Sequence, residues 1–223
     1  MNKIFTGFLV IGIAALVVAT ALFIEQKNHS EVTNVESEYV VDAADYLDAS
    51  IVADIPSSDV SDSEIAGLIQ MREEEKLARD VYSELYDIWG VAIFRNIASS
   101  EQTHTDAVKT LLDRYGITDP VTSDERGVLT NSDFVALYAS LVEAGSGSLV
   151  DALTVGATIE DLDIYDLGQL LADVDNDDIR TVYQNLERGS ENHMRAFVRQ
   201  LDSRGSSYSA QYISQDEVDR ITR

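Results

Sequence analysis

Apolar residues recur every three or four positions through four long segments of the chain, which is the pattern of amphipathic α-helices. Glycine and proline mark the breaks between them, at Gly90, at Gly116 with Pro120, and in the run 145–147. Sustained β alternation and internal repeats are absent from the sequence. The expected long helices span about 63–89, 92–115, 149–171 and 177–203, and a short helix spans about 132–143. We therefore expect an all-α fold of four long helices, with a long crossover between the second and third that carries the short helix.

The apolar stripe of each long helix is interrupted by an acidic or histidine side chain. The interrupting residues are, in helix order, Glu75; Glu101 and His104; Glu160 and Asp163; and His193. A carboxylate on an inward face is costly to desolvate, and it persists there mainly when it is paired or bound to a cation. The pattern therefore predicts that these side chains converge on one buried metal site.

The first part of the chain differs in character from the rest. Residues 4–24 are uncharged and mostly apolar, enough to cross a bilayer as a helix. Ala19-Thr20-Ala21 resembles a signal-peptide cleavage site, but the length of the run favours an uncleaved anchor. We therefore expect a signal anchor or signal peptide at 1–24, a disordered acidic tether at 25–61 and the helical domain at 62–223. The domain should lie outside the cytoplasm, either membrane-anchored or secreted.

Charge and composition exclude several classes of function. The chain has 40 acidic and 16 basic residues, a net charge of −24, so we expect no nucleic acid as a partner. It has no cysteine, which excludes disulfides, thiolate zinc sites and iron–sulfur clusters. The sequence also lacks a phosphate-binding P-loop, a Gly-x-Ser-x-Gly elbow and a His-Glu-x-x-His helix. A metal would have to be bound by nitrogen and oxygen ligands.

Three segments carry a family resemblance. Residues 74–82, 100–104 and 189–197 resemble a ferritin-like family of uncharacterised prokaryotic proteins, over about 63–212 of the chain. The spacing within 75–82 is also similar to the first helix of rubrerythrin-type and bacterioferritin-type proteins. The resemblance implies a ferritin-like four-helix bundle with a core site for two iron or manganese ions. It implies the ligands Glu75, Glu101, His104, Glu160 and His193.

The fourth helix departs from this pattern, because Ser190 stands three residues before His193 where the pattern has a glutamate. Asp163, one turn after Glu160, is our hypothesis for the replacement. Glu73 and Glu74 are expected on a solvated acidic face, with Glu74 as second choice to Glu75 as a ligand. The aromatic ring of Tyr82 is expected in the core.

The resemblance implies that O2 or peroxide binds at an open coordination position, giving oxidase, peroxidase or ferroxidase activity. The protein could form a homodimer, whereas an anchored N-terminus disfavours assembly into a cage that stores iron. Three alternatives remain for the same residues. They are a buried ion-pair network with Arg79, Arg95 or Arg195, a non-catalytic acidic interaction protein, and a closed structural metal site such as zinc.

Overall fold

The structure is a computed structural model that describes residues 52–223, and within this range it contains helices and no strand. The helices are α1 (Asp62–Trp89), α2 (Ala92–Tyr115), α3 (Ser132–Gly145), α4 (Leu149–Asp173), α5 (Asp177–Asp202) and α6 (Gln215–Thr222). The expected all-α class is confirmed. The four long helices and the short helix of the crossover lie where the apolar periodicity predicts them, to within one or two residues at their ends. The helix α6 was not predicted.

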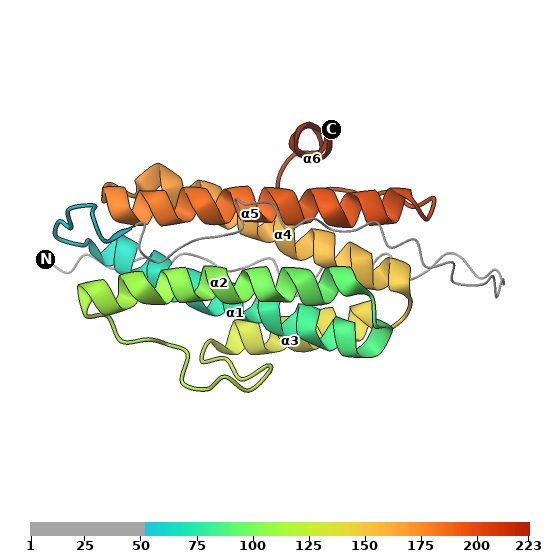
Figure 1. Cartoon of the computed structure of the whole chain (residues 1–223), viewed down its shortest axis with the longest axis horizontal. Helices are drawn as coiled ribbons and strands as arrows, with labels where there is room; N and C mark the ends of the chain where they lie inside the picture. The colour runs from blue at the N-terminus through green and yellow to red at the C-terminus, as the bar shows by residue number, and fades with distance from the viewer. Residues whose placement is uncertain (1–51) are drawn as a thin grey trace, which may run out of the picture. The chain divides into compact units, whose positions relative to one another are not determined.

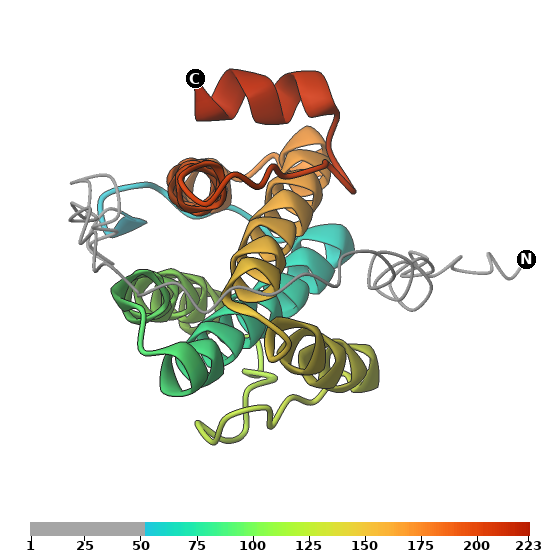
Figure 2. The same cartoon turned by 90° about the vertical axis from the view of Figure 1, so that its right-hand side faces the viewer.

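The four long helices lie side by side around a shared core (Figures 1 and 2). α1 packs mainly against α2, and α4 packs mainly against α5. Further contacts of α1 with α4 and of α2 with α5 close the arrangement, while α3 packs on α1 and α4. Gly90 and Gly116 end the first two helices in the left-handed conformation, each with φ of 66°, which glycine adopts without strain.

The first helix begins with a capping box. Ser61 accepts a hydrogen bond from the backbone N–H of Glu64, and the Glu64 carboxylate accepts one from the backbone N–H of Ser61. These two bonds satisfy donors that a helix N-terminus otherwise leaves unpaired. Ser61 is therefore the N-cap of α1.

The long connection between α2 and α3 is bound to one charged face of α1. The Glu73 carboxylate accepts hydrogen bonds from the backbone N–H groups of Thr130 and Asn131. Buried Lys76 donates to the backbone carbonyl of Glu125. The prediction that Glu73 is solvated is thus wrong, because the connection covers this face and its backbone N–H groups need acceptors.

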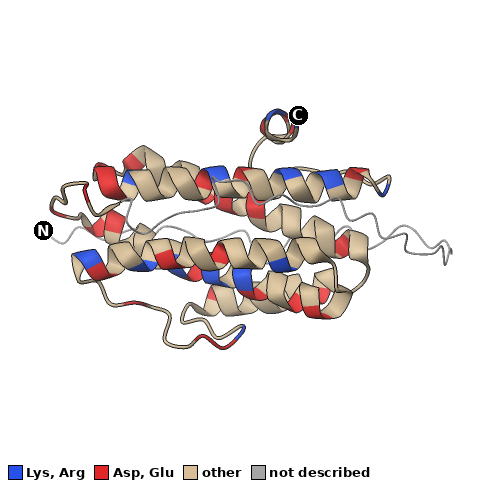
Figure 3. Ribbon diagram, in the orientation of Figure 1, with Lys and Arg blue, Asp and Glu red and all other residues tan. Residues whose placement is uncertain are grey.

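Charged residues remain abundant on the outside. In the view of Figure 3, acidic residues are seen along the helices, and basic residues are seen on α1, α2, α5 and α6. This distribution accords with the strongly negative net charge of the chain.

The predicted anchor at 4–24 and residues 25–51 of the predicted tether lie outside the described residues. Among the helices of 52–223, none is both long and apolar enough to span a bilayer. Val52 is buried in the core, and its backbone carbonyl accepts a hydrogen bond from Arg114 of α2. Residues just before α1 are therefore packed against the helices.

The C-terminal segment crosses the side of α4. Buried Asp161, in the middle of α4, accepts hydrogen bonds from the hydroxyl of Tyr208 and from the backbone N–H groups of Gln211, Tyr212 and Ile213. A single carboxylate thereby satisfies four donors of a segment that has no regular structure of its own. The following helix α6 packs on α5.

Candidate metal centre

The six predicted ligands all point into the interior between the long helices. α1 supplies Glu75, α2 supplies Glu101 and His104, α4 supplies Glu160 and Asp163, and α5 supplies His193. Five of them are at most 2% exposed, and Asp163 is 6% exposed. Burial of this many ionisable groups in one place requires compensation by opposite charge or by a cation.

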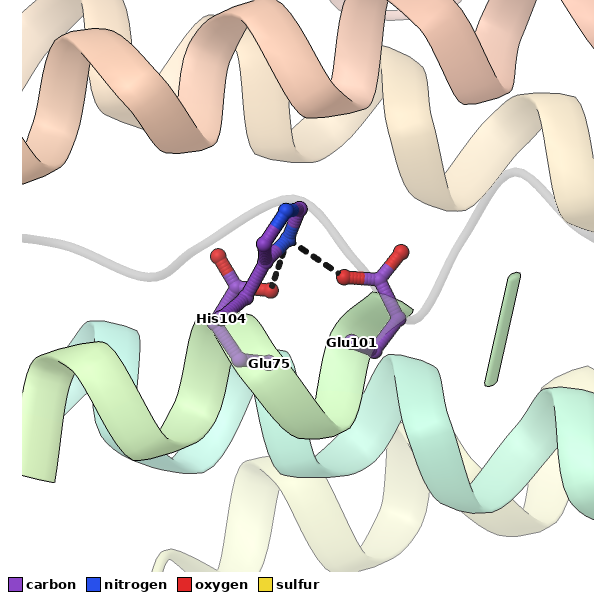
Figure 4. Close-up of side chains that lie close together, drawn as sticks. All are labelled: Glu75, Glu101 and His104. Atoms are coloured by element: carbon purple, nitrogen blue, oxygen red, sulfur yellow. Dashed lines mark ion pairs between the residues drawn. The ribbon is translucent and has the colours of Figure 1, made fainter. Parts of the chain in front are cut away.

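Glu101 lies at the middle of the group and contacts both imidazole rings. Its Oε2 lies 2.7 Å from Nδ1 of His104, and its Oε1 lies 2.8 Å from Nδ1 of His193. Glu75 Oε2 lies 3.3 Å from the same His104 nitrogen (Figure 4). Glu160 Oε2 lies 3.5 Å from the His193 nitrogen. Each imidazole therefore faces Glu101 and one further glutamate.

These contacts form two overlapping groups whose donor atoms lie within 4.8 Å of one another. The first contains Glu75, Glu101 and His104, and the second contains Glu101, Glu160 and His193. The two imidazole rings stack with centroids 5.5 Å apart, so the groups are immediate neighbours. Each group has the number and type of ligands that can hold a metal ion.

Asp163 is close to both groups but belongs to neither. Its Oδ2 accepts a hydrogen bond from the hydroxyl of Ser190, and its Oδ1 is buried without a hydrogen-bond partner. Burial, together with the charges of Glu75, Glu160 and Glu101, raises the pKa of Asp163 well above its ordinary value. Ser190, which stands where the family pattern has a glutamate, thus donates a hydrogen bond to Asp163 on another helix.

The electrostatics reflect an excess of carboxylates over imidazoles. Burial raises the pKa of Glu75 to about 8 and that of Glu160 to about 7, although the neighbouring imidazoles oppose the rise. Burial would lower the pKa of His193, but the charges of Glu101 and Glu160 raise it to about 10. For Glu101, burial would raise the pKa, but the charges of the two imidazolium rings hold this pKa below its usual range. Protons therefore occupy this site at neutral pH unless cations replace them.

Neighbouring residues hold the ligands in place. The buried hydroxyl of Tyr82 donates to Glu160 Oε1, and it also lies 3.2 Å from the backbone carbonyl of Gly156. Ser100 Oγ lies 3.1 Å from Nε2 of His193. Tyr82 is in the core, as predicted. Ser100 was not identified as a site residue from the sequence, because it stands beside the apolar stripe, although it begins the family-like segment 100–104.

Gly189 of α5 makes room for His104. A Cβ atom at this position would lie 2.5 Å from Cε1 and 2.6 Å from Nε2 of the imidazole. Such distances are well inside van der Waals contact. The absence of a side chain at Gly189 therefore allows the ring to lie against the opposite helix.

The three arginines considered as partners of a buried network make other contacts. Arg79 bonds to Asp80 and Gln102, and Arg195 bonds to the backbone carbonyl of Ile221. Arg95 lies over the ring of Tyr86. Within 52–223, the network interpretation through these arginines is therefore wrong, and the carboxylates face imidazoles instead.

Glu74 is also buried, contrary to its predicted place on a solvated face. It is 4% exposed, and the side-chain amide of Gln70, one turn earlier on α1, donates to it over 3.3 Å and also donates to Asp166 of α4. It belongs to neither metal-binding group. Helix α1 packs against α2 on one side and against α4 on another. Adjacent glutamates of α1 can therefore both be buried.

Comparison with known proteins gives the family. Residues 64–223 match a family described as an uncharacterised protein domain, DUF2202. The chain belongs to this family. The expected resemblance to an uncharacterised domain family is confirmed, although the family's description names neither a ferritin-like fold nor a reaction.

A similar protein is the uncharacterised protein MJ0754 of Methanocaldococcus jannaschii. It is 58% identical over 170 residues, which are 76% of this chain and 92% of that protein. A crystal structure of hypothetical protein MJ0754 from Methanococcus jannaschii superposes with a TM-score of 0.74 and covers 75% of this chain and 96% of that one. The DUF2202 helices described above thus correspond to nearly the whole of that structure.

Proposed function

We propose that this DUF2202 domain is a ferritin-like four-helix bundle that binds two metal ions, iron or manganese, in its core. The observation that carries the proposal is the pair of overlapping groups that share Glu101. One oxygen of Glu101 faces each histidine, so a single carboxylate can serve both ions. Ferritin-like di-metal proteins use this combination of inward glutamates and histidines from four helices.

The donor set fits such ions. Nitrogen and oxygen donors without thiolates suit iron and manganese. Oε1 of Glu75 and Oδ1 of Asp163 are buried without hydrogen-bond partners, and such oxygens are costly unless a cation or a proton compensates them. Four carboxylates against two neutral imidazoles would balance the charge of two divalent cations.

Each ligand then has a distinct role in the proposal. Glu75, Glu101 and His104 would hold one ion, and Glu101, Glu160 and His193 would hold the other. We propose that Asp163 replaces the glutamate that the family pattern has at Ser190. The hydrogen bond from Ser190 to Asp163 supports this role, because it orients the carboxylate in the interior.

Two iron or manganese ions bound here would supply redox chemistry toward O2 or peroxide, as an oxidase, peroxidase or ferroxidase. The residues of the chain itself would orient the ligands and exclude water from the site. Tyr82 holds the Glu160 carboxylate. With a metal ion on Nδ1 of His193, its Nε2–H would donate to Ser100 Oγ, which lies 3.1 Å away and would fix the tautomer. Phe197 packs against Tyr82, with ring centroids 5.4 Å apart.

A structural metal site is the second candidate, and the burial of the ligands favours it. With five ligands at most 2% exposed, a bound zinc ion would stabilise the fold without an accessible coordination position. Loss of metal would then lower the melting temperature strongly, with no reaction toward O2 or peroxide.

We also propose that residues 4–24 place the domain outside the cytoplasm, as an anchor or as a cleaved signal. Fractionation of cells that express the full chain tests this. The domain should be found in the membrane fraction or the medium, and recovery in the cytosol would contradict the proposal.

Elemental analysis tests the metal centre. The full chain, purified without chelators, is compared with a variant carrying Glu101→Ala and His104→Ala. We expect about two iron or manganese ions per chain in the wild type and loss of both in the variant. Reduction of O2 or peroxide by the Fe(II)-loaded protein then separates the redox centre from a structural one. A wild-type chain that binds no metal after anaerobic Fe(II) reconstitution refutes the proposal.

A further inference from the structure

The ligands of the proposed centre are nearly inaccessible to solvent, so a metal ion needs a path to reach them. Such a path must offer ligands, because a divalent cation does not cross an apolar interior without compensation of its charge. The contact between α1 and α4 is the place where carboxylates lead from the surface toward the centre.

Two carboxylates meet at this contact through one amide. Gln70 Nε2 donates to Oε2 of Glu74 over 3.3 Å and to Oδ2 of Asp166 over 3.0 Å. Glu74 lies on α1 and Asp166 on α4, so the amide connects the two helices. Asp166 is half-buried, so it is the member of the pair that lies nearer the solvent.

The inner carboxylate of the pair is incompletely satisfied. Oε1 of Glu74 is buried and has no hydrogen-bond partner. In the described part of the chain, neither Glu74 nor Asp166 forms an ion pair with lysine or arginine. This is an arrangement that a cation would stabilise.

Asp163 continues the series toward the centre. It lies one turn before Asp166 on α4, and its Oδ1 is also buried without a partner. Glu75 lies next to Glu74 on α1, and the bridging amide of Gln70 connects Glu74 to Asp166 on α4. Acidic residues of α1 and α4 therefore lie at this contact next to ligands of the centre.

We propose that Glu74 and Asp166 form a divalent-cation site at the contact of α1 with α4, from which the ion passes by Asp163 to the buried centre. The destination of the ion rests on the proposed function. The site itself rests only on the two carboxylates, the bridging amide and the unpartnered oxygen.

The rate of metal loading tests the route. Mn2+ is added to the metal-free full chain, and the loss of the electron paramagnetic resonance signal of free Mn2+ is followed in time. The test variant is Asp166→Asn, and the control is Asp173→Asn, which removes an exposed carboxylate from the same helix. We expect Asp166→Asn to slow the loading of the centre about tenfold or more, since focused negative charge raises cation on-rates by about 10 to 1,000-fold. The final occupancy of the centre should be unchanged, and the control should load at the wild-type rate.

Equilibrium binding tests the site separately from the centre. The variant with Glu101→Ala and His104→Ala should still bind one Mn2+ weakly, and the addition of Asp166→Asn should remove it. Wild-type loading rates in Asp166→Asn, or equal binding with and without Asp166→Asn in the double variant, would overturn the inference. If the wild type and the double variant bind equal numbers of ions, the proposed centre fails, and the comparison at Asp166 still decides the outer site.

Discussion

Replacement of Gly189 by alanine introduces one methyl group against the imidazole of His104. The new Cβ would lie 2.5 Å from Cε1 of the ring, whereas carbon atoms pack at about 3.5 Å or more. The ring or helix α5 must therefore move by about 1 Å. His104 is fully buried, and its Nδ1 is held by Glu101 at 2.7 Å and Glu75 at 3.3 Å, so the ring cannot move without disturbing these contacts.

The expected loss of stability follows from two opposing effects. Overpacking of a close-packed interior costs about 1–3 kcal/mol. Alanine in place of glycine inside a helix regains about 1 kcal/mol. Gly189→Ala should therefore lower the free energy of unfolding by up to about 2 kcal/mol, and the melting temperature by up to about 8 °C for a domain of this size. Because metal–ligand distances tolerate only about 0.2 Å of error, we expect about one ion per chain instead of two.

Gly168→Ala is the matched control. Gly168 also lies inside a long helix, but a Cβ atom there would meet no atom within 4 Å. This variant should gain stability and keep both ions. Circular dichroism during heating and elemental analysis of both variants are the measurements. A Gly189→Ala protein with two ions and the melting temperature of Gly168→Ala would refute the inference that His104 packs tightly against α5.

Three further outcomes follow from the contacts of the centre. Ser190→Ala should weaken metal binding by about 10 to 100-fold, because Asp163 loses the hydrogen bond that orients it. Competition with a chelator measures the affinity, and an unchanged affinity would exclude Asp163 as a ligand oriented by Ser190. Tyr82→Phe should keep the metal but lower the free energy of unfolding by about 0.5–1.5 kcal/mol in urea titrations, and loss of metal would contradict this. In the metal-free chain the raised pKa of His193 stabilises the fold fully below about pH 6.5. That contribution is lost as the pH rises through about 10. The melting temperature in chelator should fall over this range, and a flat profile would refute the ion pairs.

Local periodicity in the sequence was sufficient to predict the helices α1 to α5 and the inward direction of the six candidate ligands. An amphipathic stripe is a property of one helix, because residues three or four apart share a face whatever surrounds them. Glu101 and His104, three residues apart on α2, therefore had to point the same way. The capping box of Ser61 and Glu64 is equally local, since the two residues lie three positions apart.

The contacts between helices were decided only by the tertiary structure. Periodicity does not reveal what covers the remaining faces of a helix, so Glu73 and Glu74 were predicted to be solvated. In the structure, the connection between α2 and α3 covers the first, and α4 covers the second. The bond between Ser190 and Asp163 joins two different helices, so neither residue's own helix indicates it. The shared position of Glu101 between two histidines likewise depends on the packing of α2 against α5, which the local sequence leaves undetermined.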